Sequence, residues 1–127
     1  MVGGIMIGKF YWDTYAIVEL IKGNSKFMKY FSKDTITSEL NLMELYYHML
    51  RLFDQDQANK QLNEWAYFAE NIPQHVMKLA MQYRFRNKVQ RLSYIDCMGY
   101  MFAVSNGMKF LTGDKQFEGL PHVEFVH

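Results

Sequence analysis

Hydrophobic side chains recur along this chain at spacings that switch between those of strands and those of helices. Short β-prone segments predict strands at residues 8–12, 35–37, 110–112 and 123–126. Apolar residues three and four positions apart predict helices at 15–21, 26–31, 39–53, 62–69, 76–83 and 94–105. Because helices separate most of these strands, neighbouring strands need crossover connections. We therefore expect a mostly buried parallel sheet with helices on both faces.

Three of the predicted helices carry specific expectations about packing. The helix after Ser38, a possible N-cap, is apolar on two faces, so we expect it to be deeply packed. Pro73 separates two helices that we expect to form a bundle-like half of the molecule. In the helix after Ser93, the inner side is expected to carry Ile95, Met98, Gly99 and Phe102.

Composition narrows the class of protein. The 127 residues suit one domain, so we expect a single domain over residues 1–127. Lys and Arg number 14 against 13 Asp and Glu, so any nucleic-acid surface must be a local patch. The lone Cys97 cannot form an internal disulfide, which favours a reducing, cytoplasmic location. The longest uncharged internal run, 97–108, is far shorter than the roughly 20 residues of a membrane span.

Two carboxylates follow predicted strands. Asp13 comes directly after the first strand and Asp114 follows the strand at 110–112, at the sheet edge where open α/β proteins bind ligands. Taken singly, Asp13 is as readily explained as a helix N-cap and Asp114 as a turn residue. Together they indicate a candidate site.

Two further acids lie on predicted helices. Glu44 sits beside an apolar stripe, where a carboxylate needs a partner, whereas Glu39 is explained by its place in the first helical turn. Asp96 stands three residues after Ser93, as in a capping box, yet its neighbours are apolar. Four acids brought together without Lys or Arg would repel one another unless a divalent ion neutralises them, and clustered carboxylates suit Mg²⁺ or Mn²⁺.

The order of these motifs resembles a known family. The chain reads Phe10-Tyr11-Trp12-Asp13-Thr14, then Glu19-Leu20-Ile21-Lys22-Gly23-Asn24, Thr37-Ser38, Leu42-Met43-Glu44-Leu45, Leu92-Ser93-Tyr94-Ile95-Asp96, Phe110-Leu111-Thr112-Gly113-Asp114-Lys115-Gln116-Phe117 and Val123-Glu124-Phe125-Val126. This ordered set is similar to PIN-domain proteins of the VapC toxin type over nearly the whole chain. Thr-Gly-Asp-x-x-Phe after a short strand is its most specific part.

The resemblance implies both a fold and an activity. The fold would be a PIN-like three-layer α/β/α sandwich with a central parallel sheet. The activity would be Mg²⁺- or Mn²⁺-dependent endoribonucleolytic hydrolysis of RNA, leaving 5′-phosphate and 3′-hydroxyl ends. The catalytic and metal-binding residues would be Asp13, Glu44, Asp96 and Asp114.

The resemblance also implies supporting residues and partners. Thr14 and Thr112 match positions that support the first and last acids. The chain would be the toxin of a type II toxin–antitoxin pair, silenced by a VapB-type antitoxin, and a homodimer. It departs from some members at Gln116, where they carry another acid, and Glu39 on the same helix competes with Glu44 for the second acidic position.

Other residues and other classes of function remain open. Two sets of basic residues are candidate RNA contacts: a sparse set, Lys22, Lys26, Lys29 and Lys33, and a denser set, Lys78, Arg84, Arg86, Lys88 and Arg91, with Tyr83 and Phe85 interleaved. The four histidines have no zinc-ligand spacing, and Cys97 is expected in the core. The alternatives are a catalytically inactive PIN-like module that binds a partner protein and a phosphoacceptor signalling domain.

Overall fold

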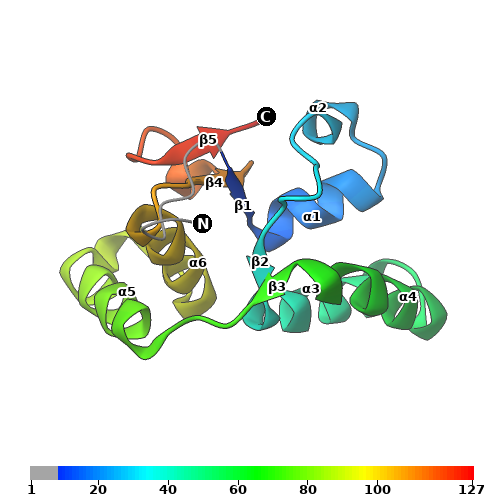
Figure 1. The fold of residues 1–127 in the computed structure, drawn as a ribbon, viewed down its shortest axis with the longest axis horizontal. Coiled ribbons are helices and arrows are strands. Elements are labelled where there is room, and N and C mark those ends of the chain that lie inside the picture. The colour runs from blue at the N-terminus through cyan, green and yellow to red at the C-terminus, as the bar shows by residue number, and fades with distance from the viewer. Residues whose placement is uncertain (1–8) are drawn as a thin grey trace.

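The computed structural model describes residues 9–127 (Figure 1). Its strands are β1 (Phe10–Trp12), β2 (Thr37–Ser38), β3 (Ala69–Glu70), β4 (Lys109–Thr112) and β5 (Val123–Phe125). Its α-helices are α1 (Thr14–Ile21), α2 (Ser25–Met28), α3 (Glu39–Leu52), α4 (Gln55–Trp65), α5 (Gln74–Arg86) and α6 (Tyr94–Ser105). Most of these elements overlap the predicted ones, but α4 begins seven residues before the helix predicted at 62–69, and β3 was not predicted. Gly8, the predicted start of the first strand, lies outside the described residues.

All strand pairs in the described chain are parallel. Strands β1, β4 and β5 form one sheet in the order β1-β4-β5, with Tyr11 opposite Phe110 and Thr112 opposite Phe125. Strands β2 and β3 pair separately, and a bridge between Tyr11 and Ile36 brings β2 beside β1. The predicted parallel sheet is confirmed.

Alternate residues of the strands face opposite sides of the sheet. Tyr11 and Phe110 are fully buried on one side, against α5 and α6. Trp12 and Leu111 are fully buried on the other side, within the core that α1, α3 and α4 cover. Figure 1 shows the same arrangement, with α5 and α6 on one side of β1 and β4, and α1 to α4 on the other. The three-layer α/β/α sandwich expected from the sequence is therefore confirmed.

Short polar residues fix the helix ends as predicted. The Ser38 hydroxyl accepts a hydrogen bond from the Asn41 amide, and Ser93 and Asp96 form a reciprocal capping box on α6. Helix α6 ends at Asn106, after which Gly107 adopts a φ of +67°, a conformation that favours glycine. These caps place Glu44 and Asp96 at fixed positions along their helices.

Helix α3 differs from its predicted packing. The side of α3 that carries Leu42, Leu45 and Met49 is buried. On its other side, Met43 is 60% exposed and Tyr47 is 62% exposed. The expectation of a deeply packed helix was wrong because α1, α4 and the sheet cover the Leu42, Leu45 and Met49 side of α3, and its other apolar side is left uncovered. Its second apolar face is part of the molecular surface.

The helices around Pro73 and the inner side of α6 also differ from expectation. Helix α4 packs against α3, whereas α5 packs against α6 on the opposite side of the sheet, so the two do not form a bundle. The segment between them includes β3, which the periodicity had assigned to a helix. On α6, Gly99 and Phe102 are buried as expected, but Ile95 and Met98 are half-buried, and Cys97 and Tyr100 enter the core instead.

Within residues 9–127, no helix is long and apolar enough to cross a membrane.

Candidate active site

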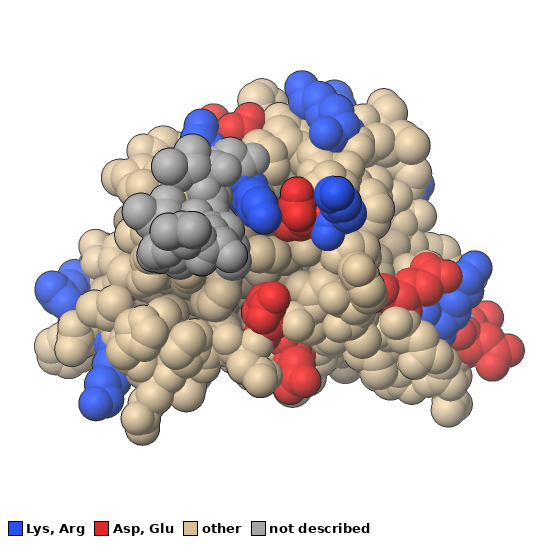
Figure 2. Space-filling view, in the orientation of Figure 1, with Lys and Arg blue, Asp and Glu red and all other residues tan. Residues whose placement is uncertain are grey.

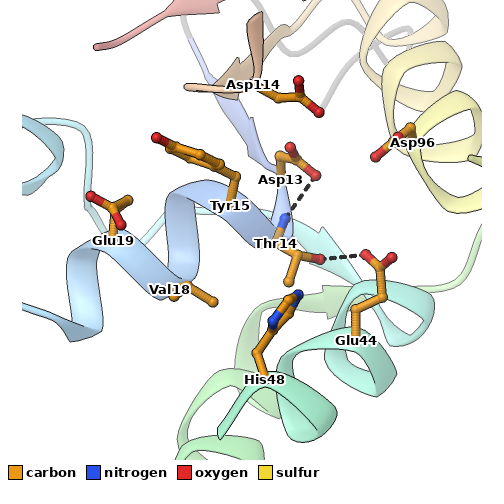
Figure 3. Close-up of a pocket in the computed structure, with 9 residues that line it drawn as sticks. All are labelled: Asp13, Thr14, Tyr15, Val18, Glu19, Glu44, His48, Asp96 and Asp114. Carbon is orange, nitrogen blue, oxygen red and sulfur yellow. Dashed lines mark hydrogen bonds between the residues drawn. The ribbon is translucent and has the colours of Figure 1, made fainter. Parts of the chain in front are cut away.

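A cavity of about 310 Å³ opens near the carboxyl ends of β1 and β4 (Figure 3). Its walls include the four acids singled out in the sequence, Asp13, Glu44, Asp96 and Asp114. They come from the end of β1, the middle of α3, the first turn of α6 and the loop after β4. We call this cavity the acidic pocket. Glu39, the competing glutamate, is exposed and lines a different depression with Leu40 and Glu70.

Asp13 lies deepest in the acidic pocket and is only 4% exposed. Its Oδ1 accepts a hydrogen bond from the Thr14 amide at 2.8 Å, and its Oδ2 accepts one from the Thr112 hydroxyl at 2.7 Å. The Thr112 hydroxyl oxygen also accepts from the Asp114 amide at 3.0 Å. Asp13 is thus both the N-cap of α1 and a pocket residue, so the two explanations of this aspartate hold together.

Glu44 is oriented by Thr14, the first residue of α1. The Thr14 hydroxyl donates to Glu44 Oε1 at 2.7 Å, which links α1 to α3 (Figure 3). The two threonines predicted to support the acids therefore both contact carboxylates. Each hydroxyl bonds an acid that lies on another segment of the chain: Thr14 bonds Glu44 and Thr112 bonds Asp13.

Asp96 and Asp114 also line the pocket, with Asp96 above Glu44 and Asp114 above Asp13 in the view of Figure 3. Asp96 Oδ2 accepts from the Ser93 amide at 3.0 Å as part of the capping box. Asp114 Oδ1 accepts from the Gln116 amide at 3.0 Å. Each of these acids uses one carboxylate oxygen to stabilise its own loop or helix end.

The described pocket walls include acidic side chains but no Lys or Arg, and this raises the proton affinity of the acids. Burial, followed by the charges of Asp96 and Glu44, raises the pKa of Asp13 from 3.8 to about 8. Burial is also the main cause that raises the pKa of Glu44 and of Asp96, and Asp114 adds to the effect on Asp96. Negative charge in the pocket is therefore destabilised as long as no cation is present.

The donor chemistry of the pocket fits a hard divalent cation. Four carboxylates supply only oxygen atoms, which Mg²⁺ and Mn²⁺ prefer, and a cation would relieve their mutual repulsion. Among residues 9–127, no three His, Cys, Asp or Glu side chains are positioned together as a complete ligand set. Octahedral Mg²⁺ retains several waters, so such a site does not need every carboxylate in direct contact.

The pocket contains residues that sequence reasoning did not assign to a site. Tyr15, Val18, Glu19 and His48 also line it. His48 stands one turn after Glu44 on α3, and this i, i+4 spacing was the available signal. Burial and then the nearby Arg51 lower the pKa of His48. Asn41, which is 1% exposed, donates from Nδ2 to Thr14 Oγ1 at 3.0 Å.

Cys97 is buried and free, in the core cluster that packs on α5 and α6. Burial, followed by the charge of Asp96, raises the pKa of the Cys97 thiol to about 11. A thiol of this kind is protonated at neutral pH and is a poor nucleophile. Its predicted place in the core is confirmed.

The two candidate sets of basic residues differ in their partners. In the sparse set, Lys22 pairs with Glu19 at 3.3 Å and Lys26 donates to the His127 carbonyl at 2.8 Å. In the part of the chain that the structure describes, no ion pair engages Lys78, Arg84, Arg86, Lys88 or Arg91. Figure 2 shows basic and acidic residues interspersed on one face, without a continuous basic patch.

Arg84 of the denser set contacts the start of α6. Its Nε donates to the Leu92 carbonyl at 3.0 Å, and its guanidinium lies 4.5 Å from the centre of the Tyr94 ring. Tyr94 is 62% exposed and stands two residues before Asp96, but it lines an apolar groove and not the acidic pocket. An exposed aromatic ring and a cation therefore lie together at the end of α6 that carries Asp96.

The sequence matches the PIN domain family over residues 10–123, so the chain belongs to that family. This range contains all four acids of the pocket. No curated protein matches the chain significantly.

The fold is similar to that of toxins whose structures are known. Against VapC20 of Mycobacterium tuberculosis, a toxin that cleaves the sarcin–ricin loop, the TM-score is 0.77 at 16% identity, covering 93% of this chain and 97% of that one. Against DNA-bound VapBC from Salmonella typhimurium it is 0.72 at 19% identity, covering 95% and 98%. A toxin–antitoxin complex from Klebsiella pneumoniae gives 0.69 at 18% identity, covering 91% and 95%.

Proposed function

We propose that this PIN-domain protein is a Mg²⁺- or Mn²⁺-dependent endoribonuclease and the toxin of a type II toxin–antitoxin pair. The observation that carries the proposal is the convergence of Asp13, Glu44, Asp96 and Asp114 on one pocket without a Lys or Arg in its walls. Four separate segments contribute these acids, and the raised pKa values of three of them indicate a site built to receive positive charge.

Each acid has a role in this proposal. Asp13, Glu44 and Asp96 would hold one cation directly or through water, and Asp114 would assist it or help to bind a second. The cation supplies the charge that stabilises a phosphodiester transition state and activates water for attack. Thr112 and Thr14 hold Asp13 and Glu44 in place, so that these carboxylates need not reorganise when the cation binds. No side-chain nucleophile is required.

RNA binding is assigned to the surface beside α6. The Arg84–Tyr94 pair offers a phosphate contact and a stacking face at the start of α6, the helix that carries Asp96, and single-stranded RNA is commonly bound by such pairs. The other residues of the denser basic set lie on α5 and the loop after it, and they extend the positive surface away from the acids.

A cognate antitoxin and a second copy of the chain complete the proposal. These two partners are supported by the similarity of the fold to chains of toxin–antitoxin complexes and by the exposed apolar face of α3. Next to Met43 on that face, an apolar groove of about 470 Å³ is lined by Leu40, Met43, Ser93, Tyr94, Ile95 and Met98. Such a groove is suited to an apolar helix or strand of a partner.

The test is cleavage of a mixed RNA pool by the purified protein with Mg²⁺, with Mn²⁺ and with EDTA. We expect metal-dependent cleavage that is lost in Asp13→Asn and in Asp96→Asn. Glu39→Gln, which neutralises an exposed acid on α3 outside the pocket, is the matched control and should retain activity. Folded protein that neither cuts RNA nor binds Mn²⁺ would reject the proposal and favour the catalytically inactive partner-binding module.

A further inference from the structure

Asn41 lies beneath the acidic pocket and has no place in the proposed chemistry. It occupies the first turn of α3, three residues before Glu44, so both side chains project from the same face of the helix. Asn41 is 1% exposed and does not line the pocket. A buried amide has two donor hydrogens and a carbonyl oxygen to satisfy, so its partners reveal what it does.

The Asn41 amide bonds three hydroxyl groups. Asn41 Oδ1 accepts hydrogen bonds from the Tyr11 hydroxyl and, at 2.9 Å, from the Ser38 hydroxyl, and Nδ2 donates to Thr14 Oγ1 at 3.0 Å. Hydroxyl groups can donate or accept, but an ionised carboxylate only accepts, so the Thr14 hydroxyl must donate to Glu44. The Thr14 oxygen is then left to accept, which requires Asn41 Nδ2 to face it.

The Thr14 hydroxyl links the Asn41 amide to the Glu44 carboxylate. A threonine hydroxyl has only one proton, and the Thr14 oxygen already accepts from Asn41. Its proton is thus directed to Glu44 Oε1, at 2.7 Å. The hydrogen bonds run in one direction, from Tyr11 and Ser38 through Asn41 and Thr14 to the carboxylate.

We infer that Asn41 is a positioning residue of the acidic pocket, which acts through Thr14 to hold the Glu44 carboxylate in one orientation. The inference rests on the proposed function and adds to it a residue that touches neither cation nor RNA. Groups behind a metal site typically change metal affinity or activity by about 10- to 100-fold when removed. Because Asn41 is buried, its loss should lower kcat and Mn²⁺ affinity while leaving the KM for RNA unchanged.

Two substitutions test the direction of the hydrogen bonds. Asn41→Leu removes the amide and keeps a similar volume. Asn41→Asp keeps the shape but replaces the Nδ2 donor with an acceptor, so the Thr14 proton has a second carboxylate to bond. For each variant we expect kcat for RNA cleavage and Mn²⁺ affinity measured by calorimetry to fall by about 10-fold or more, with KM unchanged.

A double-mutant cycle with Thr14→Val separates positioning from general damage. If Asn41 acts through the Thr14 hydroxyl, Asn41→Leu will cause no further loss of kcat in a protein that already lacks that hydroxyl. If Asn41 is merely structural, the fold-losses in kcat of the two single variants will multiply in the double variant. Independent losses of this kind overturn the inference.

Asn106→Leu is the matched control for stability. Asn106 is half-buried at the end of α6, far along that helix from Asp96, and its Nδ2 donates to the Phe102 carbonyl at 2.8 Å. The Asn106→Leu substitution should lower the melting temperature while kcat stays unchanged. Should Asn41→Leu fail to fold, Tyr11→Phe takes its place, because it removes one donor to Asn41 Oδ1 and keeps the ring. A smaller fall in kcat at constant KM is then expected.

The outcomes distinguish this inference from the proposed function. If the wild-type protein cuts RNA and the Asn41 variants keep its kcat and Mn²⁺ affinity, the inference is wrong and the proposed function stands. If the wild-type protein does not cut RNA, the proposed function fails. The affinity for Mn²⁺ then tests the inference by itself. Weaker binding by Asn41→Leu than by wild type supports it. Equal binding by the two proteins, or no binding by wild type, overturns it.

Discussion

The Thr112 hydroxyl donates a hydrogen bond to Asp13 Oδ2 at 2.7 Å, although the two residues are 99 positions apart in the sequence. The contact is possible because β1 and β4 are parallel neighbours, so their carboxyl ends meet at one edge of the sheet. Thr112 is fully buried, and its oxygen also accepts from the Asp114 amide. One hydroxyl therefore connects the acid that follows β1 to the loop that carries another acid of the pocket.

Thr112→Val should lower activity more than stability. Valine keeps the β-branched shape that suits β4, but it leaves Asp13 Oδ2 and the Asp114 amide without their partner. We expect kcat for RNA cleavage to fall about 10- to 100-fold and Mn²⁺ affinity to weaken, as for other groups that orient a metal-binding carboxylate. Thr112→Ser, which keeps the hydroxyl, should stay near the wild-type kcat. Equal losses in both variants would point to packing instead.

The stability of the metal-free protein should fall as the pH rises. Burial and then the charges of Asp96 and Glu44 raise the pKa of Asp13 from 3.8 to about 8, so between these values the folded state binds a proton that the unfolded state has lost. The stabilising contribution is complete below the unfolded pKa and is lost as the pH rises through the folded pKa. Melting temperatures in EDTA should therefore decline from pH 5 to pH 8.

Asp13→Asn is the control for this pH dependence. Asparagine cannot ionise, so the decline between pH 5 and pH 8 should become shallower and the variant should be more stable than wild type at pH 8. Saturating Mn²⁺ should reduce the decline in the wild-type protein by favouring the ionised carboxylate. An unchanged slope in Asp13→Asn would assign the pH dependence to other groups.

Gly99→Ala should destabilise the fold. A Cβ at this position of α6 would lie 2.6 Å from Tyr11 Cε1 and 3.1 Å from Phe110 Cε1, and both rings are fully buried. Alanine usually stabilises a helix by about 1 kcal/mol relative to glycine, but overpacking costs about 1–3 kcal/mol. Because the rings are buried and cannot move aside, we expect the overpacking cost to exceed the helix gain, for a net loss of up to about 2 kcal/mol in urea unfolding. Ser105→Ala, at an exposed position of the same helix, should cause no such loss.

Tyr94→Ala should weaken RNA binding without affecting the cation. Stacking of a base on an aromatic side chain contributes about 1–3 kcal/mol, so KM for single-stranded RNA should rise about 5-fold or more while Mn²⁺ affinity stays constant. Tyr94→Phe keeps the ring and should behave as wild type. The matched control is Tyr67→Ala, which removes a tyrosine that is 81% exposed and remote from the acids in sequence. A similar rise in KM for both alanine variants would count against a specific stacking site.

The sequence determined the parallel sheet and the sides of its strands. Strand residues alternate between the two cores, as Tyr11 and Trp12 show, and crossover helices require parallel neighbours. It also singled out four of the five acids that line the pocket, because each of these four stands next to a strand end, a helix cap or an apolar stripe, whereas Glu19 was missed. These are local signals, carried by residues a few positions apart.

Only the tertiary structure decided which groups meet across the sheet. Periodicity shows that α3 is apolar on two faces, but the number of layers around it decides that Met43 and Tyr47 remain exposed. The same holds for Asn41, whose sequence neighbours give no reason to connect it with Thr14, 27 residues away. Hydrogen bonds between distant segments depend on how the helices pack on the sheet, and that packing is settled by the whole chain at once.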